Sequence, residues 1–386
     1  MDPIVIVGTG LAGYTTAREF RRHDNETPLV IVSADDGTSY SKPMLSTAMA
    51  RGKSPADLAQ ASATEMAAQY QADVRTHTRV TAIDGQQRTV ALADGSELRA
   101  AAIVLAVGAE QMDPGLGGDG ADDVFAVNDL STYSALRGEL THAERVVIIG
   151  GGLIGCEFAN DWARSGYHVT IIEPQQRPLG RMLPELAGNT LAAALQSEGI
   201  TLATGRFAER VERADGAFIV HDDQGTTYPA DVVVRAIGLQ PRTELARAAG
   251  IEVGRGIATD RHLQTGAAGI YALGDCAEVD GLVLPFIMPI NQCARALGAT
   301  LAGTPTAVEY PVMPVIVKTA SCPVQLYSPS PSIAGEWQEE ALKGGTRSLF
   351  HDTEGRLRGF ALTGSAVREK GELAKAVPGY FDNRSP

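Results

Sequence analysis

The chain has 386 residues, enough for two or three domains with buried cores. Its net charge of −13 argues against general nucleic-acid binding, which requires clustered positive charge. No apolar run approaches the roughly 20 residues that span a bilayer, and a core strand follows Met1 too closely to leave room for a signal peptide. We therefore expect a cytoplasmic protein that binds neither nucleic acid nor membrane.

The four cysteines, Cys156, Cys276, Cys293 and Cys322, show no C-x-x-C or C-x-x-x-x-C spacing. This spacing argues against a redox disulfide and against a zinc cluster, so we predict no metal site. The simpler interpretation is four reduced structural thiols in a reducing compartment.

Strand-like runs alternate with helical patterns along the first 110 residues, which favours parallel sheets built from α/β units. The expected elements, in chain order, are a strand over 3–7, a helix over 12–23, a strand over 29–32, a helix over 56–70, short strands over 80–83 and 89–92 followed by a hairpin signal at Asp94-Gly95, and a strand over 102–107.

A second α/β pattern runs from about residue 119 to residue 234, and residues 263–274 resemble a return to the first domain. A helix is expected over 291–302, a β-rich segment over 311–360 and a closing helix over 365–376. We therefore predict an α/β fold with two Rossmann-like dinucleotide-binding domains and a small C-terminal α+β domain. The predicted boundaries are 1–110 with 236–305, then 111–235, then 306–386.

Two copies of one glycine fingerprint carry the chemistry. In each copy a β-branched apolar run leads directly into G-x-G-x-x-G and then into a helical pattern, over residues 4–13 and 146–155. The first glycine allows the tight turn, the second lets backbone approach a pyrophosphate, and the third allows close packing of the helix on the sheet. One copy would be weak evidence, but two copies in this context predict two bound dinucleotides and electron transfer between them.

The residue that holds the ribose at the first fingerprint is left open by the sequence. An acid is normally found at the end of the second strand, where it accepts hydrogen bonds from the ribose hydroxyls. Here Ser33 occupies that place, and the acids Asp35 and Asp36 follow it. Either Ser33 or Asp35 could bind the ribose, and the acids could equally form a solvated turn before Gly37.

At the second fingerprint, the second strand over 169–172 is closed by Glu173. A carboxylate at this place binds both ribose hydroxyls of NADH and repels the 2′-phosphate of NADPH, which predicts NADH. Arg177, four residues later, could instead accept a phosphate or make a surface contact.

Three further segments resemble one enzyme family. Residues 105–109 resemble the A-T-G-A strand end of two-dinucleotide flavoprotein reductases, residues 236–245 their G-x-x-P-N-x-x-L element, and residues 270–277 their second FAD signature. In order and spacing they are typical of FAD-dependent pyridine nucleotide oxidoreductases with a glutathione-reductase-like fold. This resemblance implies FAD at the first fingerprint, with Asp275 at its ribityl chain or phosphate, and NADH at the second.

The segment over 40–46 contains no cysteine, where disulfide reductases of this fold carry two and NADH peroxidases and oxidases carry one. Electrons would then leave the flavin directly. The same segment resembles the R-P-x-L-S element of ferredoxin and rubredoxin reductases, and Lys42 in place of arginine is typical of rubredoxin and flavorubredoxin reductases. Residues 313–319 also resemble the rubredoxin reductases.

This resemblance implies an enzyme that passes hydride from NADH to FAD and then single electrons to rubredoxin, feeding alkane hydroxylation. We expect it to act as a monomer. Two alternatives remain open: an NADH reductase of flavorubredoxin or of a [2Fe–2S] ferredoxin, and a flavin-based redox sensor.

The resemblance also assigns roles to charged residues. Lys42 would lie beside the flavin N5, Glu157 near the nicotinamide, and the two would pair at the flavin; ordinary surface ion pairs are the alternative. Lys318 would lie near the flavin pyrimidine. The predicted catalytic residues are Lys42 and Glu157. The predicted FAD-binding residues are Gly8, Thr9, Gly10, Leu11, Ala12, Gly13, Ser33, Ala34, Asp35, Lys42, Val80, Gly108, Glu157, Asp275, Ile287 and Lys318. The predicted NADH-binding residues are Gly150, Gly152, Leu153, Ile154, Gly155, Glu173 and Gly238.

Overall fold

A five-stranded parallel sheet carries the first fingerprint in the computed structural model of the chain, which describes residues 1–383. Its β-branched and apolar runs are buried on both faces, as expected for a parallel sheet covered by helices. At its centre, Val5 lies beside Val30 on one neighbouring strand and beside Ile103 on the other. The strands in spatial order are β20 (Ile270–Ala272), β9 (Ala102–Leu105), β1 (Ile4–Val7), β2 (Leu29–Val32) and β5 (Asp73–Arg75).

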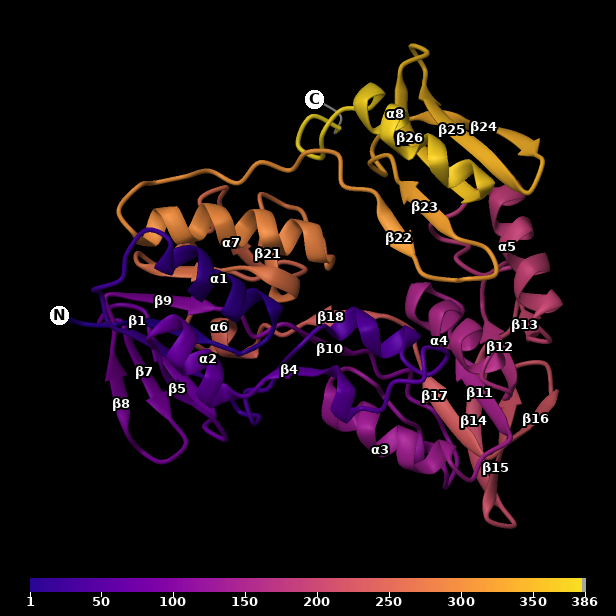
Figure 1. The fold of residues 1–386 in the computed structure, drawn as a ribbon, viewed down its shortest axis with the longest axis horizontal. Helices are drawn as coiled ribbons and strands as arrows, with labels where there is room; N and C mark the ends of the chain where they lie inside the picture. Colours follow the sequence, from indigo (N-terminus) through magenta and orange to yellow (C-terminus); the bar gives the residue numbers. More distant parts are fainter. Residues whose placement is uncertain (384–386) are drawn as a thin grey trace. The chain divides into compact units, whose positions relative to one another are not determined.

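Helices α1 (Leu11–Arg21) and α7 (Ile287–Leu301) pack side by side on this sheet (Figure 1). Their close approach depends on Gly298, because a Cβ placed there would lie 2.7 Å from the backbone carbon of Glu19. The predicted helices at these positions are confirmed, with ends that differ by a few residues.

The helix predicted over 56–70 is wrong in its first half. Ser62 caps the N-terminus of α2 (Ala63–Tyr70) by accepting a hydrogen bond from the backbone of Glu65, and the Glu65 side chain accepts one from the backbone of Ser62. This capping box begins the helix at Ala63. The preceding residues form a 3-10 turn, η2 (Ala56–Leu58), and a short strand, β4 (Ala59–Ala61), which pairs with β3 (Ser39–Tyr40).

Smaller elements complete this part of the chain. The two short strands and the hairpin predicted at Asp94-Gly95 are confirmed within an antiparallel sheet of β6 (Val80–Asp84), β7 (Thr89–Leu92) and β8 (Glu97–Arg99). The remaining elements are β10 (Ala109–Gln111), β18 (Leu239–Pro241), α6 (Glu244–Ala248), β19 (Ile257–Thr259), η4 (Gly274–Cys276) and β21 (Ala277–Val279).

The second fingerprint opens a four-stranded parallel sheet of the same design. Its order is β13 (Thr201–Thr204), β12 (His168–Glu173), β11 (Arg145–Ile149) and β17 (Val232–Arg235). A three-stranded antiparallel sheet of β14 (Ala208–Ala214), β15 (Ala217–Asp222) and β16 (Thr227–Ala230) packs against it through a shared apolar core. The helices are α3 (Leu130–Leu140), α4 (Leu153–Ala163) and α5 (Glu185–Ser197), with the short 3-10 turn η3 (Ala121–Asp123).

The C-terminal segment forms a five-stranded antiparallel sheet, as its β-rich composition predicts. The order is β22 (Val315–Val317), β23 (Val324–Tyr327), β26 (Leu357–Gly364), β25 (Gly345–Asp352) and β24 (Gly335–Leu342). The closing helix α8 (Lys370–Ala376), preceded by the 3-10 turn η5 (Ser365–Glu369), lies along β26 (Figure 1). Helix α5 packs against the same sheet, and Glu339 on β24 accepts hydrogen bonds from the free N–H groups of Leu186 and Ala187 at the α5 N-terminus.

Contacts between Cα atoms divide the chain into two compact units. The first comprises residues 1–41, 59–110 and 239–310, and the second comprises residues 42–58, 111–238 and 311–386. The α/β fold class is confirmed, and the exact domain boundaries predicted from sequence stay a prediction. Within residues 1–383, no helix is both long and apolar enough to cross a membrane.

Candidate functional site

The first fingerprint forms a tight strand-to-helix turn that leaves open space at its centre. Gly8 has a φ of +118°, and a Cβ on it would lie 2.3 Å from the Ala106 carbonyl oxygen. A Cβ on Gly13 would lie 1.9 Å from the Gly8 carbonyl oxygen, whereas Gly10 has nothing within 4 Å of that position. The backbone is therefore compact where the helix must pack and open where a pyrophosphate would approach the N-terminus of α1.

The second fingerprint repeats this geometry. A Cβ on Gly150 would lie 2.6 Å from the Ala236 carbonyl oxygen, and one on Gly155 would lie 2.0 Å from the Gly150 carbonyl oxygen. Gly152 is open, its nearest neighbour being the Ala236 oxygen at 3.9 Å. Leu153 and Ile154 begin α4 here, as Leu11 and Ala12 begin α1 at the first fingerprint. Both sites fit a dinucleotide pyrophosphate.

At the first site, the two candidate ribose ligands lie in one hydrogen-bond network. The Ser33 hydroxyl donates to Asp35 Oδ1 at 2.5 Å, and the Thr9 hydroxyl lies 2.6 Å from Ser33 Oγ and 3.0 Å from the same carboxylate oxygen. The backbone N–H of Gly37 also donates to Asp35 Oδ1. Ser33, which directly follows β2, is buried, whereas Ala34 and Asp35 are exposed. The buried serine therefore anchors an exposed carboxylate.

The second FAD signature approaches the first fingerprint through a glycine. Gly274 has a φ of +80°, and a Cβ there would lie 2.8 Å from the Cβ of Ala12. Asp275 follows it in η4, directly after β20. The other predicted FAD ligands of this unit lie at or next to element ends: Val80 begins β6, Gly108 directly precedes β10, and Ile287 begins α7 and is 40% exposed.

Glu173 is held rigidly at the end of β12. Its Oε2 accepts a hydrogen bond from the Gly151 backbone N–H at 2.6 Å, and its Oε1 accepts one from the Gln175 N–H at 2.9 Å. These bonds attach the carboxylate to the second fingerprint while leaving lone pairs for ribose hydroxyls, since a carboxylate offers about four acceptor positions.

Arg177, the residue that could have favoured NADPH, lies against α5. A Cβ on Gly188 would lie 3.1 Å from Arg177 Cδ, and Arg177 Nε is buried without a hydrogen-bond partner within residues 1–383. Gly238, the last predicted NADH ligand, has a φ of +119°, and its carbonyl accepts a hydrogen bond from the Met112 N–H.

An ion pair connects the buried Glu157 on α4 to the half-buried Lys318, just after β22. The Lys318 ammonium lies 2.5 Å from Glu157 Oε2 and its backbone N–H lies 2.8 Å from Oε1. Ser46 donates to the same Oε2 at 2.5 Å, and Lys318 also donates to the Pro43 carbonyl. The glutamate is only 1% exposed, so this arrangement provides the partners that a buried charge requires.

Lys318 and Ser46 are thus direct partners of Glu157, and the predicted pair of Lys42 with Glu157 stays a prediction. Lys42 begins the 3-10 helix η1 (Lys42–Thr47) and donates a hydrogen bond to the Asn128 side chain at 2.6 Å. Lys318 nevertheless contacts the segment that contains Lys42, because its ammonium donates a hydrogen bond to the carbonyl of Pro43, the next residue.

Two residues that sequence reasoning missed follow Glu157 along α4. The side chain of Asn160 binds Ala320 N–H and the Ser321 hydroxyl, while Asp161 accepts hydrogen bonds from the Met49 and Ala50 backbones. Burial raises the pKa of Asp161, partly offset by these bonds. Their signal was polar residues on an otherwise apolar helix.

The four cysteines are buried and unpaired by disulfides. Burial raises the pKa of every thiol, to about 11 for Cys276 and about 12 for Cys293. No thiolate is therefore prepared to exchange electrons or to ligate a metal.

Residues 2–302 match the family described as Pyridine nucleotide-disulphide oxidoreductase. The chain belongs to this family. Its members use FAD and NAD(H). The prediction that the two fingerprints bind FAD and NADH is therefore confirmed at the level of the cofactors. Residues 307–377 match a second family, described as Rubredoxin binding C-terminal domain.

Similar proteins extend the family assignment over nearly the full chain. A rubredoxin-NAD(+) reductase of Alcanivorax borkumensis is 46% identical, covering 98% of this chain and 99% of that protein. A nitric oxide reductase FlRd-NAD(+) reductase of Aliivibrio fischeri is 35% identical, covering 95% and 96%. Among solved structures, a putidaredoxin reductase–putidaredoxin complex aligns with a TM-score of 0.87 and 26% identity, covering 98% of this chain and 94% of that chain. These matches confirm the fold of the family's two-dinucleotide reductases.

Proposed function

We propose that this protein is an NADH-dependent flavoprotein reductase that transfers electrons from NADH through FAD to rubredoxin. The observation that carries this proposal is the pair of fingerprints followed by a segment of the rubredoxin-binding family. Lys318, within that segment, contacts Glu157 on the helix that the second fingerprint opens. The segment that matches the rubredoxin-binding family and the helix of the second fingerprint are thus joined by direct bonds.

FAD would be held by the first fingerprint, with its pyrophosphate at the N-terminus of α1 above Gly10. In this proposal Asp35 accepts the ribose hydroxyls, and Ser33 and Thr9 fix its carboxylate through their hydrogen bonds to Oδ1. Asp275 would bind the ribityl chain or phosphate, close to the same fingerprint through Gly274. This assigns the serine and the aspartate to different roles, which the sequence left open.

NADH would be held by the second fingerprint, with its pyrophosphate at the N-terminus of α4 and its ribose hydroxyls on Glu173. The carboxylate cannot swing away to admit a 2′-phosphate, because two backbone N–H groups hold its two oxygens. Its negative charge would then repel NADPH.

When bound, FAD would accept a two-electron hydride from NADH and release electrons singly, chemistry that a flavin cofactor supplies. The protein supplies charge and position. Lys42 and Lys318 would place positive charge where reduced flavin accumulates negative charge, and Glu157 would keep the Lys318 ammonium in place. No thiol would take part, because all four cysteines are buried and burial raises the pKa of each thiol. Electrons would therefore pass to the acceptor without a disulfide relay.

The test is stopped-flow reduction of the FAD-loaded protein by NADH, followed by mixing with rubredoxin or with a [2Fe–2S] ferredoxin. We expect rapid reoxidation by rubredoxin and slow reoxidation by ferredoxin. Rapid transfer to ferredoxin with slow transfer to rubredoxin would overturn the proposal, and slow transfer to every acceptor would favour the redox sensor.

A flavorubredoxin acceptor is the second candidate, because the Aliivibrio fischeri relative is an FlRd-NAD(+) reductase and shares 35% identity. The same mixing experiment with flavorubredoxin separates the two by comparing reoxidation rates.

For the rubredoxin reductase we also propose that it acts in the cytoplasm and supplies electrons to alkane hydroxylation. A strain that grows on alkanes equally well without this gene would contradict the role in alkane hydroxylation.

A further inference from the structure

Phe207 is a large aromatic side chain that the folded protein leaves in solvent. It is 59% exposed, and within residues 1–383 only Met1 exposes more among the large apolar side chains. It lies in the loop between β13 and β14. An aromatic ring can bury roughly 150–250 Å², so an exposed ring on a rigid loop is a ready contact surface for a flat ligand.

The loop that carries Phe207 is bonded to the strand end that carries Glu173. Thr204 pairs with Glu173 in the parallel sheet, and the next two N–H groups continue the attachment. Gly205 donates to the Gln175 carbonyl at 3.0 Å, and Arg206 donates to the Glu173 carbonyl at 3.2 Å. Phe207 therefore follows directly at the carboxyl edge of the sheet, where dinucleotides bind in folds of this type.

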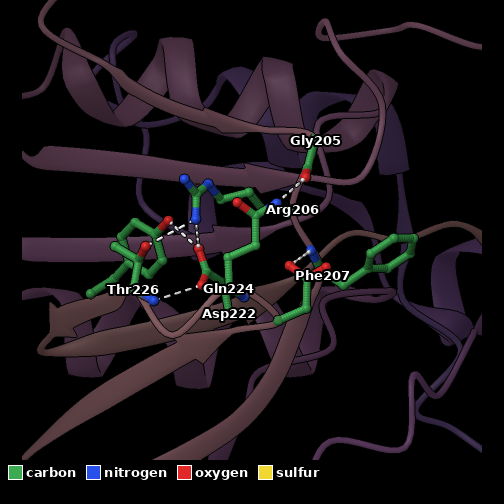
Figure 2. Close-up of polar contacts among 8 residues, drawn as sticks. Gly205, Arg206, Phe207, Asp222, Gln224 and Thr226 are labelled. Carbon is green, nitrogen blue, oxygen red and sulfur yellow. Dashed lines mark hydrogen bonds and ion pairs between the residues drawn. The ribbon is translucent and has the colours of Figure 1, made fainter.

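A buried carboxylate fixes the side chain of Arg206 (Figure 2). Asp222 accepts hydrogen bonds from Arg206 Nη1 at 2.9 Å, Tyr228 Oη at 2.8 Å, and the backbone N–H groups of Gln224 and Thr226 at 3.0 and 2.7 Å. All of these bonds are made to the carboxylate of Asp222, which is only 2% exposed. They hold the turn over 222–226 and the Arg206 side chain in one arrangement.

The backbone of Phe207 is held as well. Its N–H donates to Asp223 Oδ1 at 3.0 Å, and its carbonyl accepts from the Asp223 N–H at 2.9 Å. Figure 2 shows the Arg206 side chain directed toward Asp222 and the Phe207 ring directed away from that cluster. Ordering the ring on binding would therefore cost little backbone entropy.

We propose that the ring of Phe207 is the stacking platform for the adenine of NADH, an inference that rests on NADH binding at the second fingerprint. The adenine is bonded to the ribose whose hydroxyls Glu173 would bind, so the base must lie near the carboxyl ends of β12 and β13. A base there needs a flat apolar surface, and Phe207 supplies one on the loop attached to Glu173. In the same loop, Arg206 Nη1 is bonded to Asp222 and the Phe207 N–H to Asp223.

Calorimetry with ADP-ribose, which carries the adenosine and both phosphates but no nicotinamide, isolates this contact in the FAD-loaded protein. We expect Phe207→Ala to raise its Kd about 5- to 100-fold, the range of base–aromatic stacking, and Phe207→Tyr to keep affinity within about twofold. Ile316→Ala, which removes another exposed apolar side chain of the same unit, should leave the Kd unchanged. Flavin reduction by NADH should require correspondingly higher NADH concentrations in Phe207→Ala. Reduction by reduced nicotinamide mononucleotide, which lacks the adenosine, should be unaffected.

An unchanged Kd for ADP-ribose in Phe207→Ala would overturn the inference while leaving the proposed function intact. Equal losses with NADH and with reduced nicotinamide mononucleotide would also overturn it, as would a Phe207→Tyr variant that binds as weakly as Phe207→Ala. Either result places the defect in the loop rather than in the ring. If NADH failed to reduce the flavin of the wild-type protein, that result would instead overturn the proposed function itself.

Discussion

Lys318 binds the carboxylate of Glu157 twice, through its ammonium at 2.5 Å from Oε2 and through its backbone N–H at 2.8 Å from Oε1. One residue thus supplies both a charge and a main-chain donor to a glutamate that is 1% exposed. Because 161 positions separate them in the chain, the pair attaches the C-terminal segment to the helix of the second fingerprint. Breaking it should affect both stability and the position of the positive charge.

Lys318→Met should destabilise the second unit by about 3–5 kcal/mol, since it leaves a buried carboxylate without its cation. Thermal unfolding of the FAD-loaded protein should show this as a lower Tm. Lys343→Met, at an exposed turn between β24 and β25, is the matched control and should change Tm little. The double variant Lys318→Met with Glu157→Gln should recover part of the loss. A double variant no more stable than Lys318→Met would contradict the assignment of the loss to an unpaired charge.

Asp35→Asn should weaken FAD binding roughly 10- to 100-fold, because a hydrogen bond to a charged group contributes about 1.5–3 kcal/mol. Fluorescence titration of the apoprotein with FAD measures this change. Asp36→Asn is the control, since Asp36 is the adjacent acid and its carboxylate accepts a hydrogen bond from the Thr38 N–H. Equal effects of the two substitutions would mean that the ribose is not bound by Asp35.

Glu173→Ala should reduce the preference for NADH over NADPH by tenfold or more, because the variant loses both the acceptor for the ribose hydroxyls and the charge that repels a 2′-phosphate. The ratio of kcat/KM values for flavin reduction by the two nucleotides is the measurement. Glu185→Ala, an exposed acid at the start of α5, should leave the ratio unchanged. An unchanged ratio in Glu173→Ala would assign the ribose to another residue.

The thiols should be unreactive in the folded protein. At pH 8, a pKa of about 11 leaves about one in a thousand Cys276 side chains as thiolate, and burial blocks access as well. We expect iodoacetamide to label no cysteine of the native protein and all four after unfolding, as counted by mass spectrometry. Rapid native labelling at Cys156 or Cys276, accompanied by loss of electron transfer, would restore a role for a protein thiol.

Strong acid should loosen the Phe207 loop. Burial opposes ionisation of Asp222, but hydrogen bonds from Tyr228, Thr226, Gln224 and Arg206 outweigh it and lower its pKa to about 2. A depressed folded pKa contributes stability that is present above the unfolded value near 4 and is lost as pH falls toward 2. Hydrogen exchange at the 205–207 amides should accelerate across this window relative to the intrinsic rate. In Asp222→Asn, exchange should already be fast at pH 7 and show no such step.

The two fingerprints could be predicted from sequence because their chemistry is local. A strand, a tight turn and a helix N-terminus lie within about ten consecutive residues, and Gly8, Gly13, Gly150 and Gly155 are each required by a clash that a Cβ would create. Glu173 was predictable for the same reason, since its place at the end of a strand follows from the chain order. The start of α2 is also determined by local sequence, through the Ser62–Glu65 capping box, although we predicted that the helix would begin earlier.

What the tertiary structure decided is which distant residues meet. Sequence motifs indicated Lys42, Glu157 and Lys318 as charged residues near the flavin, but pairing depends on how segments far apart in the chain pack against α4. Only the fold places Lys318 on Glu157, combines Ser33 and Asp35 into one network, and leaves the ring of Phe207 exposed beside the strand end of Glu173. Glycine requirements are fixed by backbone geometry within one turn, whereas the partners of a buried charge are chosen by long-range packing, which no local pattern encodes.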